Sequence, residues 1–492
     1  MLNFGITVPT ADFEPGKLIV KFNPRVTSRQ SLKIHASMGA IPIQHIPELN
    51  IHCVTIAPGS EMEYINQYSS SSDVIFAEPN YYLHYDFIPN DPFYSKRTRT
   101  SEGLIRQWGL RRINPEPAWN FAIKASFSLK IALIDSGIDP NHPDLAAKIV
   151  EPMNFSSDDP EDYIDRLGHG TWTAGIAAAV TNNKKGVAGT SFNTASIMPI
   201  KVGDEFITLI AVINAIIYAV QKGAKVINMS FGLEHYSLGL QEALDLAWNN
   251  GVVNVASSGN SGNEQVQYPA GNNYVVAVSA TNRSNVLTVF SSWGVDMGVA
   301  SPGLAILATV PGYPVPFFSF LNYDAGSGTS ASAPFVSGVA ALQLALKPSL
   351  SNQEVIQIIE QSARPHGRKP DDNKPKAWSP FKGYGLLNAG HAVKVLRGIR
   401  RVKGRGSFYG QVVNQESGLP VGGATVSAQI NDEIKGIYTT KTNVPTLISL
   451  DTDGMFRLRN LPRGTYTILV DGQPVQTAEI IPSADRFLRL LI

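Results

Sequence analysis

The pattern of apolar and polar residues between about residues 91 and 396 alternates short apolar runs with longer, helix-like segments. Apolar runs that predict strands lie at residues 129–134, 224–229, 252–256 and 274–279. Segments that predict helices lie among them, at residues 170–180, 207–221 and 238–249. Because apolar strands alternating with helices are typical of a parallel sheet covered on both faces, we predict an α/β fold with a doubly wound, mostly parallel sheet.

The two ends of the chain have different patterns. Near the N-terminus, alternating runs at residues 17–22 and 51–56 and a helix-like segment at 28–38 predict a small α+β domain. Near the C-terminus, roughly seven short alternating runs separated by Gly, Pro and Asp favour a β-sandwich. The pattern therefore predicts four parts, at residues 12–88, 89–396, 397–405 and 406–492.

The third of these parts, residues 397–405, is strongly basic. It contains Arg397, Arg400, Arg401, Lys403 and Arg405. We interpret it as a solvated linker, and a protease-sensitive site is the alternative.

The stretch at residues 326–342 places glycine-rich backbone directly before an apolar run of small residues, which is typical of a buried helix. We expect Pro334 near the first turn of that helix, where a missing N–H costs little. Ser330 then lies at the helix N-terminus, where the macrodipole favours negative charge. The stretch alone leaves two interpretations open: a nucleophile, or a Ser/Gly-rich turn that caps a core helix.

Polar residues follow the predicted strands at the points where each strand ends. Asp135, Ser230 and Asn260 lie at such ends, and parallel sheets bind ligands beyond the carboxyl ends of their strands. His169 opens the helix predicted at 170–180. Acyl transfer needs a nucleophile, a base, a group that orients the base, and donors for an oxyanion. Each residue alone could belong to a turn or a helix boundary, so their joint occurrence carries the prediction of such a site.

Composition excludes several classes of protein. The chain has 492 residues, so two to four domains are expected, and its net charge of +1 gives no electrostatic case for a nucleic-acid partner. The longest apolar run, residues 206–220, is interrupted by polar residues and too short for a membrane span. With Cys53 as its one cysteine, the chain must be stabilised by packing, ions or ligands rather than by internal disulfides. The first residues lack the basic and apolar regions of a secretory signal, so the sequence leaves the compartment open.

Four motifs resemble those of subtilisin-like serine proteases, in particular the thermitase branch. They are Ile-Asp-Ser-Gly around Asp135, Gly-His-Gly-Thr around His169, Ser-Ser-Gly-Asn ending at Asn260 and Gly-Thr-Ser-Ala around Ser330. The resemblance implies a serine endopeptidase that hydrolyses peptide bonds through an acyl-enzyme on Ser330. It assigns His169 as the base, Asp135 as the residue that fixes its tautomer, and Asn260 with the Ser330 backbone N–H as the oxyanion donors.

The same resemblance implies a substrate-binding pocket for the P1 side chain. Its walls would be two tripeptides, Ser230-Phe231-Gly232 and Ser257-Ser258-Gly259. Neither contains an acidic residue that would select a basic side chain, so we expect a large apolar or aromatic P1 residue. Two departures from the family pattern stand out. The segment 201–206 lacks the usual glycine-rich edge for the substrate backbone, and Trp172 replaces the second histidine of the histidine motif.

Residues 179–187 resemble the calcium loop of thermitase. The matching ligands are the side chains of Asp91, Asp144 and Asn183 and the carbonyl oxygens of Val180, Lys185 and Val187. Oxygen ligands of this kind suit calcium, and the alternative is an asparagine-rich surface turn. We expect this ion to be structural and expect no catalytic cofactor, because no sequence pattern of a catalytic metal site is present.

The terminal parts also resemble known domains. Residues 12–88 resemble the inhibitor I9 prodomain of subtilases, which implies a self-processing zymogen that is inhibited by its own prodomain and cut within residues 82–89. A regulatory domain that stays attached is the alternative. Residues 406–492 resemble carboxypeptidase regulatory-like domains. The expected partners are protein or peptide substrates, and the rival hypothesis is a catalytically idle protein that acts as a scaffold through its β-sandwich.

Overall fold

The computed structural model describes residues 13–82, 87–122, 129–365, 378–397, 406–440, 454–481 and 484–492. The chain divides into two compact units, Met1–Asp86 and Phe87–Ile492. Most of the predicted linker, residues 398–405, lies outside the described residues, as do residues 83–86 of the expected cleavage segment.

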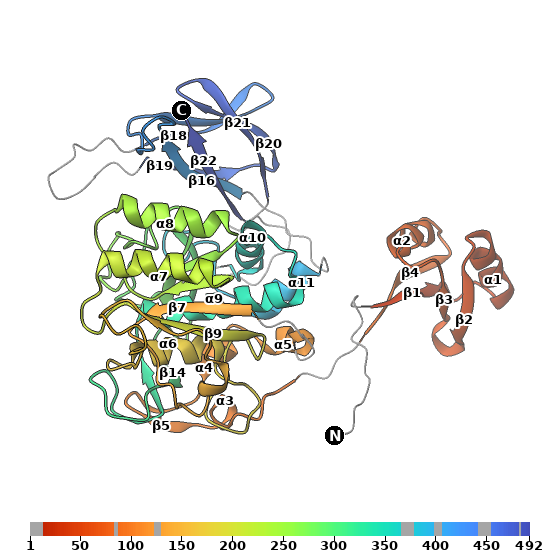
Figure 1. Cartoon of the computed structure of the whole chain (residues 1–492). Helices are drawn as coiled ribbons and strands as arrows, with labels where there is room; N and C mark the ends of the chain where they lie inside the picture. Colours follow the sequence, from red (N-terminus) through yellow and green to blue (C-terminus); the bar gives the residue numbers. More distant parts are fainter. Residues whose placement is uncertain are drawn as a thin grey trace. The chain divides into compact units, whose positions relative to one another are not determined.

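The first unit is a four-stranded antiparallel sheet with two helices packed against it (Figure 1). Its strand order is β2-β3-β1-β4. Its elements are β1 (Phe13–Phe22), α1 (Ser28–Ser37), β2 (Ile41–Ile46), η1 (Pro47–Leu49), β3 (Ile51–Thr55), α2 (Glu61–Ser69) and β4 (Val74–Tyr81). Alternate residues of β1 are buried, including Leu18, Val20 and Phe22, which is the pattern of a sheet covered on one face. The alternation at residues 17–22 therefore predicts β1 correctly.

A seven-stranded parallel sheet forms the centre of the second unit, in the order β13-β12-β11-β10-β7-β9-β8. Its strands are β7 (Leu129–Asp135), β8 (Met153–Asn154), β9 (Ala195–Lys201), β10 (Val226–Met229), β11 (Val253–Ser257), β12 (Val275–Thr281) and β13 (Met297–Pro302). From β7 the chain adds β9 and β8 on one side and β10 to β13 on the other. This reversal makes the sheet doubly wound, which confirms the predicted fold class.

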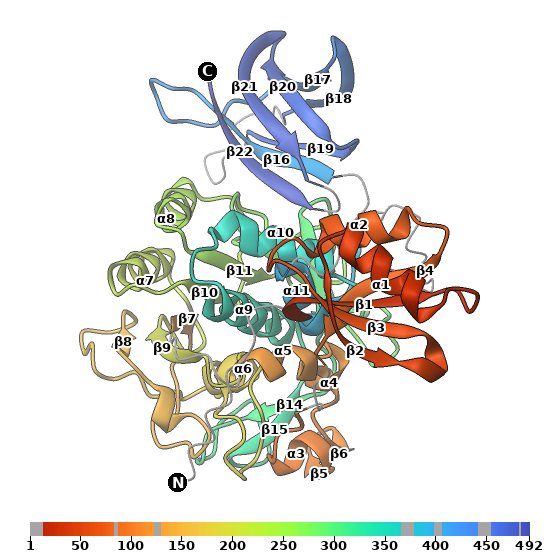
Figure 2. The ribbon, with the colours of Figure 1, turned by 90° about the vertical axis from the view of Figure 1, so that its right-hand side faces the viewer.

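Helices cover both faces of this sheet. Ile131 and Leu133 of β7 point into a core shared with α6 and α9, whereas Ala132 and Ile134 point into a second core shared with α7 and α8. The helices are α5 (Glu116–Ala122), α6 (His169–Ala178), α7 (Leu209–Gln221), α8 (Leu238–Asn249), α9 (Thr329–Leu346), α10 (Asn352–Ser362) and α11 (Ala389–Leu396). Figure 2 shows α7 and α8 side by side along one face. The helices predicted at 170–180, 207–221 and 238–249 correspond to α6, α7 and α8.

Helix α9 begins at Thr329, so Pro334 lies one turn farther into the helix than expected. A proline there leaves the Ser330 carbonyl without its usual helical donor. The Ser230 hydroxyl supplies that hydrogen bond instead, at 3.0 Å from Ser330 O. Although α9 is long and apolar enough to cross a membrane, 94% of it is buried within the fold, as in a core helix.

Several short elements complete the central part of the second unit. Two hairpins lie outside the main sheet, β5 with β6 and β14 with β15. The elements are α3 (Pro92–Ser95), β5 (Thr98–Thr100), β6 (Gly103–Ile105), α4 (Trp108–Arg112), η2 (Ala146–Lys148), β14 (Ile306–Thr309) and β15 (Tyr323–Gly326). Helix α4 packs against β14. The hairpin of β14 and β15 directly precedes α9 in the chain.

The C-terminal region is rich in strands and forms two further sheets, β19-β16-β22 and β18-β17-β20-β21, around one apolar core. Its strands are β16 (Gly406–Val413), β17 (Thr425–Ile430), β18 (Glu433–Thr439), β19 (Met455–Leu461), β20 (Gly464–Val470), β21 (Gln473–Ile480) and β22 (Asp485–Leu491). This is the arrangement of the predicted sandwich. It packs on the central part of the unit: Phe487 contacts the rings of Trp248 and Tyr274, and Tyr409 donates a hydrogen bond to Asn272 O.

Candidate active site

Asp135 is the last residue of β7 and is almost fully buried. Its Oδ1 lies 2.7 Å from Nδ1 of His169, and its Oδ2 accepts a hydrogen bond from Thr173 Oγ1 at 3.2 Å. Burial of the imidazole is the largest single influence and opposes its protonation, but the charge and hydrogen bond of Asp135 together with the charge of Asp165 outweigh it and raise the pKa of His169. The structure therefore pairs these two predicted residues as an oriented base.

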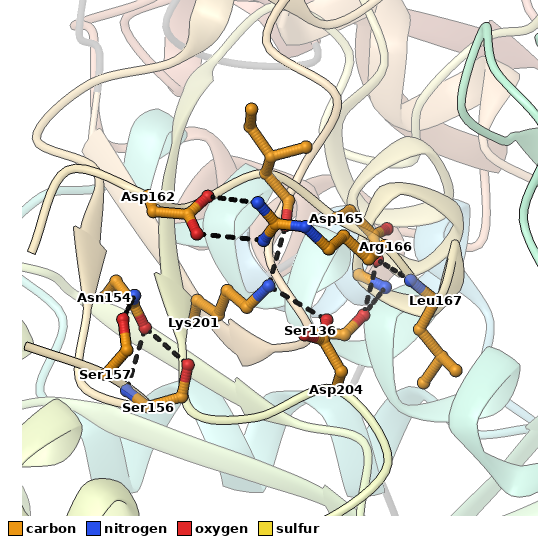
Figure 3. Close-up of polar contacts among 12 residues, drawn as sticks. Ser136, Asn154, Ser156, Ser157, Asp162, Asp165, Arg166, Leu167, Lys201 and Asp204 are labelled. Carbon is orange, nitrogen blue, oxygen red and sulfur yellow. Dashed lines mark hydrogen bonds and ion pairs between the residues drawn. The ribbon is translucent and has the colours of Figure 1, made fainter. Parts of the chain in front are cut away.

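His169 is the first residue of α6, and the loop before it is fixed by Asp165. This fully buried carboxylate accepts hydrogen bonds from the Leu167 backbone N–H and the Ser136 hydroxyl, both drawn in Figure 3. It also accepts hydrogen bonds from the backbone N–H groups of Gly168 and Thr171. A carboxylate at a helix N-terminus satisfies unpaired N–H groups and interacts favourably with the macrodipole. Asp165 belongs to none of the four motifs, although its position just before a helix start is a usable signal.

Polar contacts continue on the far side of this loop (Figure 3). The buried Lys201, at the end of β9, donates hydrogen bonds to Ile164 O at 2.8 Å and to Asp204 at 2.9 Å. Arg166 pairs with Asp162. The segment that carries His169 is therefore anchored on both sides before α6 begins.

Ser330 is the second residue of α9. Hydrogen bonds with Ser230 hold it at the edge of the sheet where Asp135 lies. The register that pairs Ile134 with Met229 places the next residues, Asp135 and Ser230, side by side. The Ser330 hydroxyl donates to Ser230 O at 3.0 Å. Within the described residues Ser330 makes no hydrogen bond to His169; contacts of this kind are often looser without substrate.

Asn260 follows β11 and faces the start of α9. Its Oδ1 accepts hydrogen bonds from the backbone N–H and the hydroxyl of Thr329, both at 2.9 Å. A β-carbon placed on Gly328 would lie 3.6 Å from Asn260 Nδ2 and 3.7 Å from Ser330 N. Two donors thus border one small space that stays open because residue 328 has no side chain.

The two predicted walls of the P1 pocket enclose the side chain of Gln267. A β-carbon on Gly232 would lie 2.4 Å from Gln267 Oε1, and one on Gly259 would lie 2.8 Å from the same atom. The carboxamide therefore lies between the two glycines, which leave room for it. Nothing in the sequence pattern of residues 260–270 marks Gln267 as part of a site.

Among the predicted calcium ligands, the structure brings together Asp91, Asp144 and Asn183. Both carboxylates are buried, and Asn183 donates its N–H to Asp91 and its Nδ2 to Asp144. Burial raises the pKa of Asp91 to about 6 against the hydrogen bonds it accepts from Asn182 and Asn183, and the nearby charge of Asp144 adds to the rise. In the described part of the chain neither carboxylate forms an ion pair with Lys or Arg.

The backbone carbonyl oxygens predicted as calcium ligands are available to bind a cation. Among the described residues, no hydrogen bond is accepted by the carbonyl oxygens of Val180, Lys185 and Val187. A search of the same residues finds no group of three His, Cys, Asp or Glu side chains suited to a metal. A cation here would therefore combine two carboxylates with amide and carbonyl oxygens, a set that suits calcium rather than zinc.

Two family models match the chain. Residues 128–385 match the model of the subtilase family, and residues 6–80 match that of the fervidolysin N-terminal prodomain. The first match covers the central sheet and helices α6 to α10. The second covers most of the first unit, so its likeness to a subtilase prodomain is confirmed.

Two relatives point to the same family as these two family models, and a solved structure shares the fold. A thermophilic serine proteinase of Bacillus sp. (strain AK1) is 33% identical over 77% of this chain and 87% of its own length. Thermitase of Thermoactinomyces vulgaris is 41% identical over 54% of this chain and 88% of its own. The crystal structure of fervidolysin from Fervidobacterium pennivorans has the same fold, with a TM-score of 0.56, 24% identity, and coverage of 98% of this chain and 79% of that one. The chain belongs to the subtilase family and is a subtilisin-like serine protease with an N-terminal prodomain.

Proposed function

We propose that this protease hydrolyses peptide bonds through an acyl-enzyme on Ser330 and is made as a zymogen that processes itself. The observation that carries the proposal is the 2.7 Å contact between Asp135 Oδ1 and His169 Nδ1, beside a serine at a helix N-terminus. Asp135 holds the imidazole with its proton on Nδ1, so that Nε2 can accept the proton of the attacking hydroxyl. The raised pKa of His169 favours the imidazolium that forms at that step.

Substrate binding must first redirect the Ser330 hydroxyl, since it donates to Ser230 O in this structure. Attack on the peptide carbonyl then develops negative charge on the carbonyl oxygen. Asn260 Nδ2 and Ser330 N border the space at Gly328 and would donate to that oxyanion. His169 next protonates the leaving amine, and water resolves the acyl-enzyme with His169 again as the base.

The P1 side chain would bind between two tripeptides, Ser230-Phe231-Gly232 and Ser257-Ser258-Gly259. The lack of acidic residues in both supports a preference for apolar or aromatic P1 residues. Gln267 occupies part of the space between Gly232 and Gly259, so a large P1 side chain must displace its carboxamide.

A structural calcium ion would be held by Asp91, Asp144 and Asn183 with the carbonyls of Val180, Lys185 and Val187. The buried carboxylates without a cationic partner and the carbonyls without donors support this assignment. When bound, the ion would neutralise the two carboxylates and cross-link the segment before α3 to the loop after α6.

We propose that residues 12–88 inhibit the catalytic domain, residues 89–396, until the chain is cut within residues 82–89. The match of residues 6–80 to a fervidolysin-type prodomain supports this arrangement. Residues 397–405 would link the catalytic domain to a carboxypeptidase regulatory-like sandwich at residues 406–492.

Labelling with a fluorophosphonate tests the proposed chemistry. The reagent should attach to Ser330 of the mature protein, as located by mass spectrometry, because only an activated serine reacts. His169→Ala should prevent labelling while leaving the thermal transition unchanged. Labelling of another serine, or none in a folded protein that has lost its prodomain, would favour the rival idle scaffold.

A further inference from the structure

A cavity of about 320 Å³ lies beside α4 and is lined mainly by arginines. The arginines are Arg97, Arg106, Arg111, Arg112 and Arg283, and Trp108 forms part of the wall. They come from four stretches of chain: the α3–β5 connection, the β6–α4 connection, α4 itself and the loop after β12. None of the residues proposed for catalysis, P1 binding or calcium lines this cavity.

All five arginines are exposed, and four of the guanidinium groups contact neutral groups. Arg283 lies over the Trp108 ring at 5.5 Å and Arg111 lies over a tyrosine ring at 5.7 Å. Arg106 donates to the Ser95 carbonyl, and Arg112 donates to the carbonyl of Arg283. Within the described residues none of the five arginines forms an ion pair with a carboxylate. The cavity thus presents preformed donors without a bound acid.

This concentration of positive charge contrasts with the rest of the chain. The whole sequence balances 41 basic against 40 acidic residues, so five arginines around one cavity are a local excess. Water screens the repulsion among these exposed charges, and an anion bound among them would remove the rest. Planar guanidinium groups bind carboxylates through paired hydrogen bonds, and an indole ring supplies apolar contact for the chain between them. The lining therefore fits a segment with several acidic side chains.

The cavity adjoins the catalytic edge. Trp108 donates to Ala305 O at 2.9 Å, and Ala305 N donates to the Ser327 hydroxyl at 2.9 Å. Ser327 lies three residues before Ser330 in the chain. Two hydrogen bonds thus connect the cavity wall to the chain segment that carries Ser330, which is the arrangement an extended substrate would need to reach both. We propose that the arginine-lined cavity is an exosite, a binding site outside the cleavage site, for acidic segments of protein substrates; this inference rests on the proposed peptidase activity.

Two matched peptides test the exosite. Both carry one cleavable sequence, extended by four glutamates in one and four glutamines in the other, and the extension is placed in turn on each side of the scissile bond. At low ionic strength the glutamate peptide should have a kcat/KM about fivefold higher on one side, as expected for several exposed ion pairs together. The advantage should disappear in about 0.5 M NaCl, where such pairs are screened.

The variant Arg97→Gln with Arg106→Gln removes two exposed charges from the cavity and keeps the ring contacts of Arg111 and Arg283. It should bring the glutamate-to-glutamine ratio close to one and leave cleavage of the glutamine peptide unchanged. The control Lys225→Gln with Lys394→Gln removes the same charge from exposed sites outside the cavity and should keep the wild-type ratio. Inorganic tripolyphosphate should compete away the glutamate advantage without slowing the glutamine peptide.

Equal cleavage of both peptides by the wild-type protein at low salt would overturn the exosite and leave the peptidase function intact. A ratio that falls equally in the lysine control would show a general charge effect and would also overturn it. Cleavage of neither peptide would contradict the peptidase function, and this inference with it.

Discussion

Gly328 carries no side chain at the point where two hydrogen-bond donors border the same space. Its backbone is extended, with φ of 160°, so an alanine fits there without strain. The added methyl carbon would lie 3.6 Å from Asn260 Nδ2 and 3.7 Å from Ser330 N and would exclude an oxyanion. We expect Gly328→Ala to lower kcat by about 10²–10³, comparable to the loss of one donor, with little change in the melting temperature Tm. An unchanged kcat would place the oxyanion elsewhere.

His169 must be neutral to act as a base, so activity should rise with pH as the imidazole loses its proton. Asp135 raises the pKa of His169 above its ordinary value of 6.5, so the midpoint of the kcat/KM profile should lie above that pH. Asp135→Asn should lower both the rate and the midpoint, since the charge that holds the proton is gone. The same midpoint in both proteins would assign the titration to another group.

Some residues of the site can be predicted from the sequence and others cannot. Asp135, His169, Asn260 and Ser330 could be selected because each stands in a motif at a strand end or helix start. Asp165 has a usable signal, its position just before a helix start, but the number of N–H groups that it binds appears only in the folded loop. Gln267 has no such signal, since its place depends on Gly232 and Gly259, which the fold brings to its side chain.

At the scale of elements, long periodic segments were predictable and short ones were not. The apolar runs of β7, β10, β11 and β12 and the helices α6, α7 and α8 have clear patterns. Helix α4, with five residues, and strand β8, with two, are too short for a period to show, and they form through contacts with elements distant in sequence. Pro334 lies farther into α9 than the sequence predicts. The Ser230 hydroxyl replaces the hydrogen bond that the proline cannot donate, and this residue belongs to a distant strand end that the local sequence does not reveal.

The loop after α6 permits a test of the proposed calcium site. Chelation should lower the Tm of the mature protein, because an ion that binds only the folded state stabilises it by about 2.7 kcal/mol at 100 times its Kd. Asp144→Asn should remove this dependence on calcium, since it leaves one carboxylate in the site. Thermal melts with chelator and with excess calcium provide the measurement. Equal Tm values for the wild-type protein in both would contradict a calcium site.

At the scale of the whole molecule, the C-terminal sandwich was predictable as a fold, but its packing on the central sheet and helices was not. Alternating strands reveal a sandwich, whereas Phe487 meets Trp248 and Tyr274 only in the folded chain. Deletion of residues 406–492 should leave kcat/KM on small peptides nearly unchanged, because among the residues that the structure describes no hydrogen bond or ring contact joins a proposed catalytic residue to the sandwich. It should lower the Tm, since these rings become exposed. Phe487→Ala should shift the Tm in the same direction by less; an unchanged Tm after deletion would show that the sandwich is independent.

Ser330 is proposed here as the nucleophile of a protease that cuts its own prodomain away. N-terminal sequencing of the purified wild-type protein beside Ser330→Ala tests this most directly. The wild-type protein should begin within residues 82–89, and Ser330→Ala should retain the prodomain uncut. The same new N-terminus in Ser330→Ala, formed at the wild-type rate, would contradict the claim.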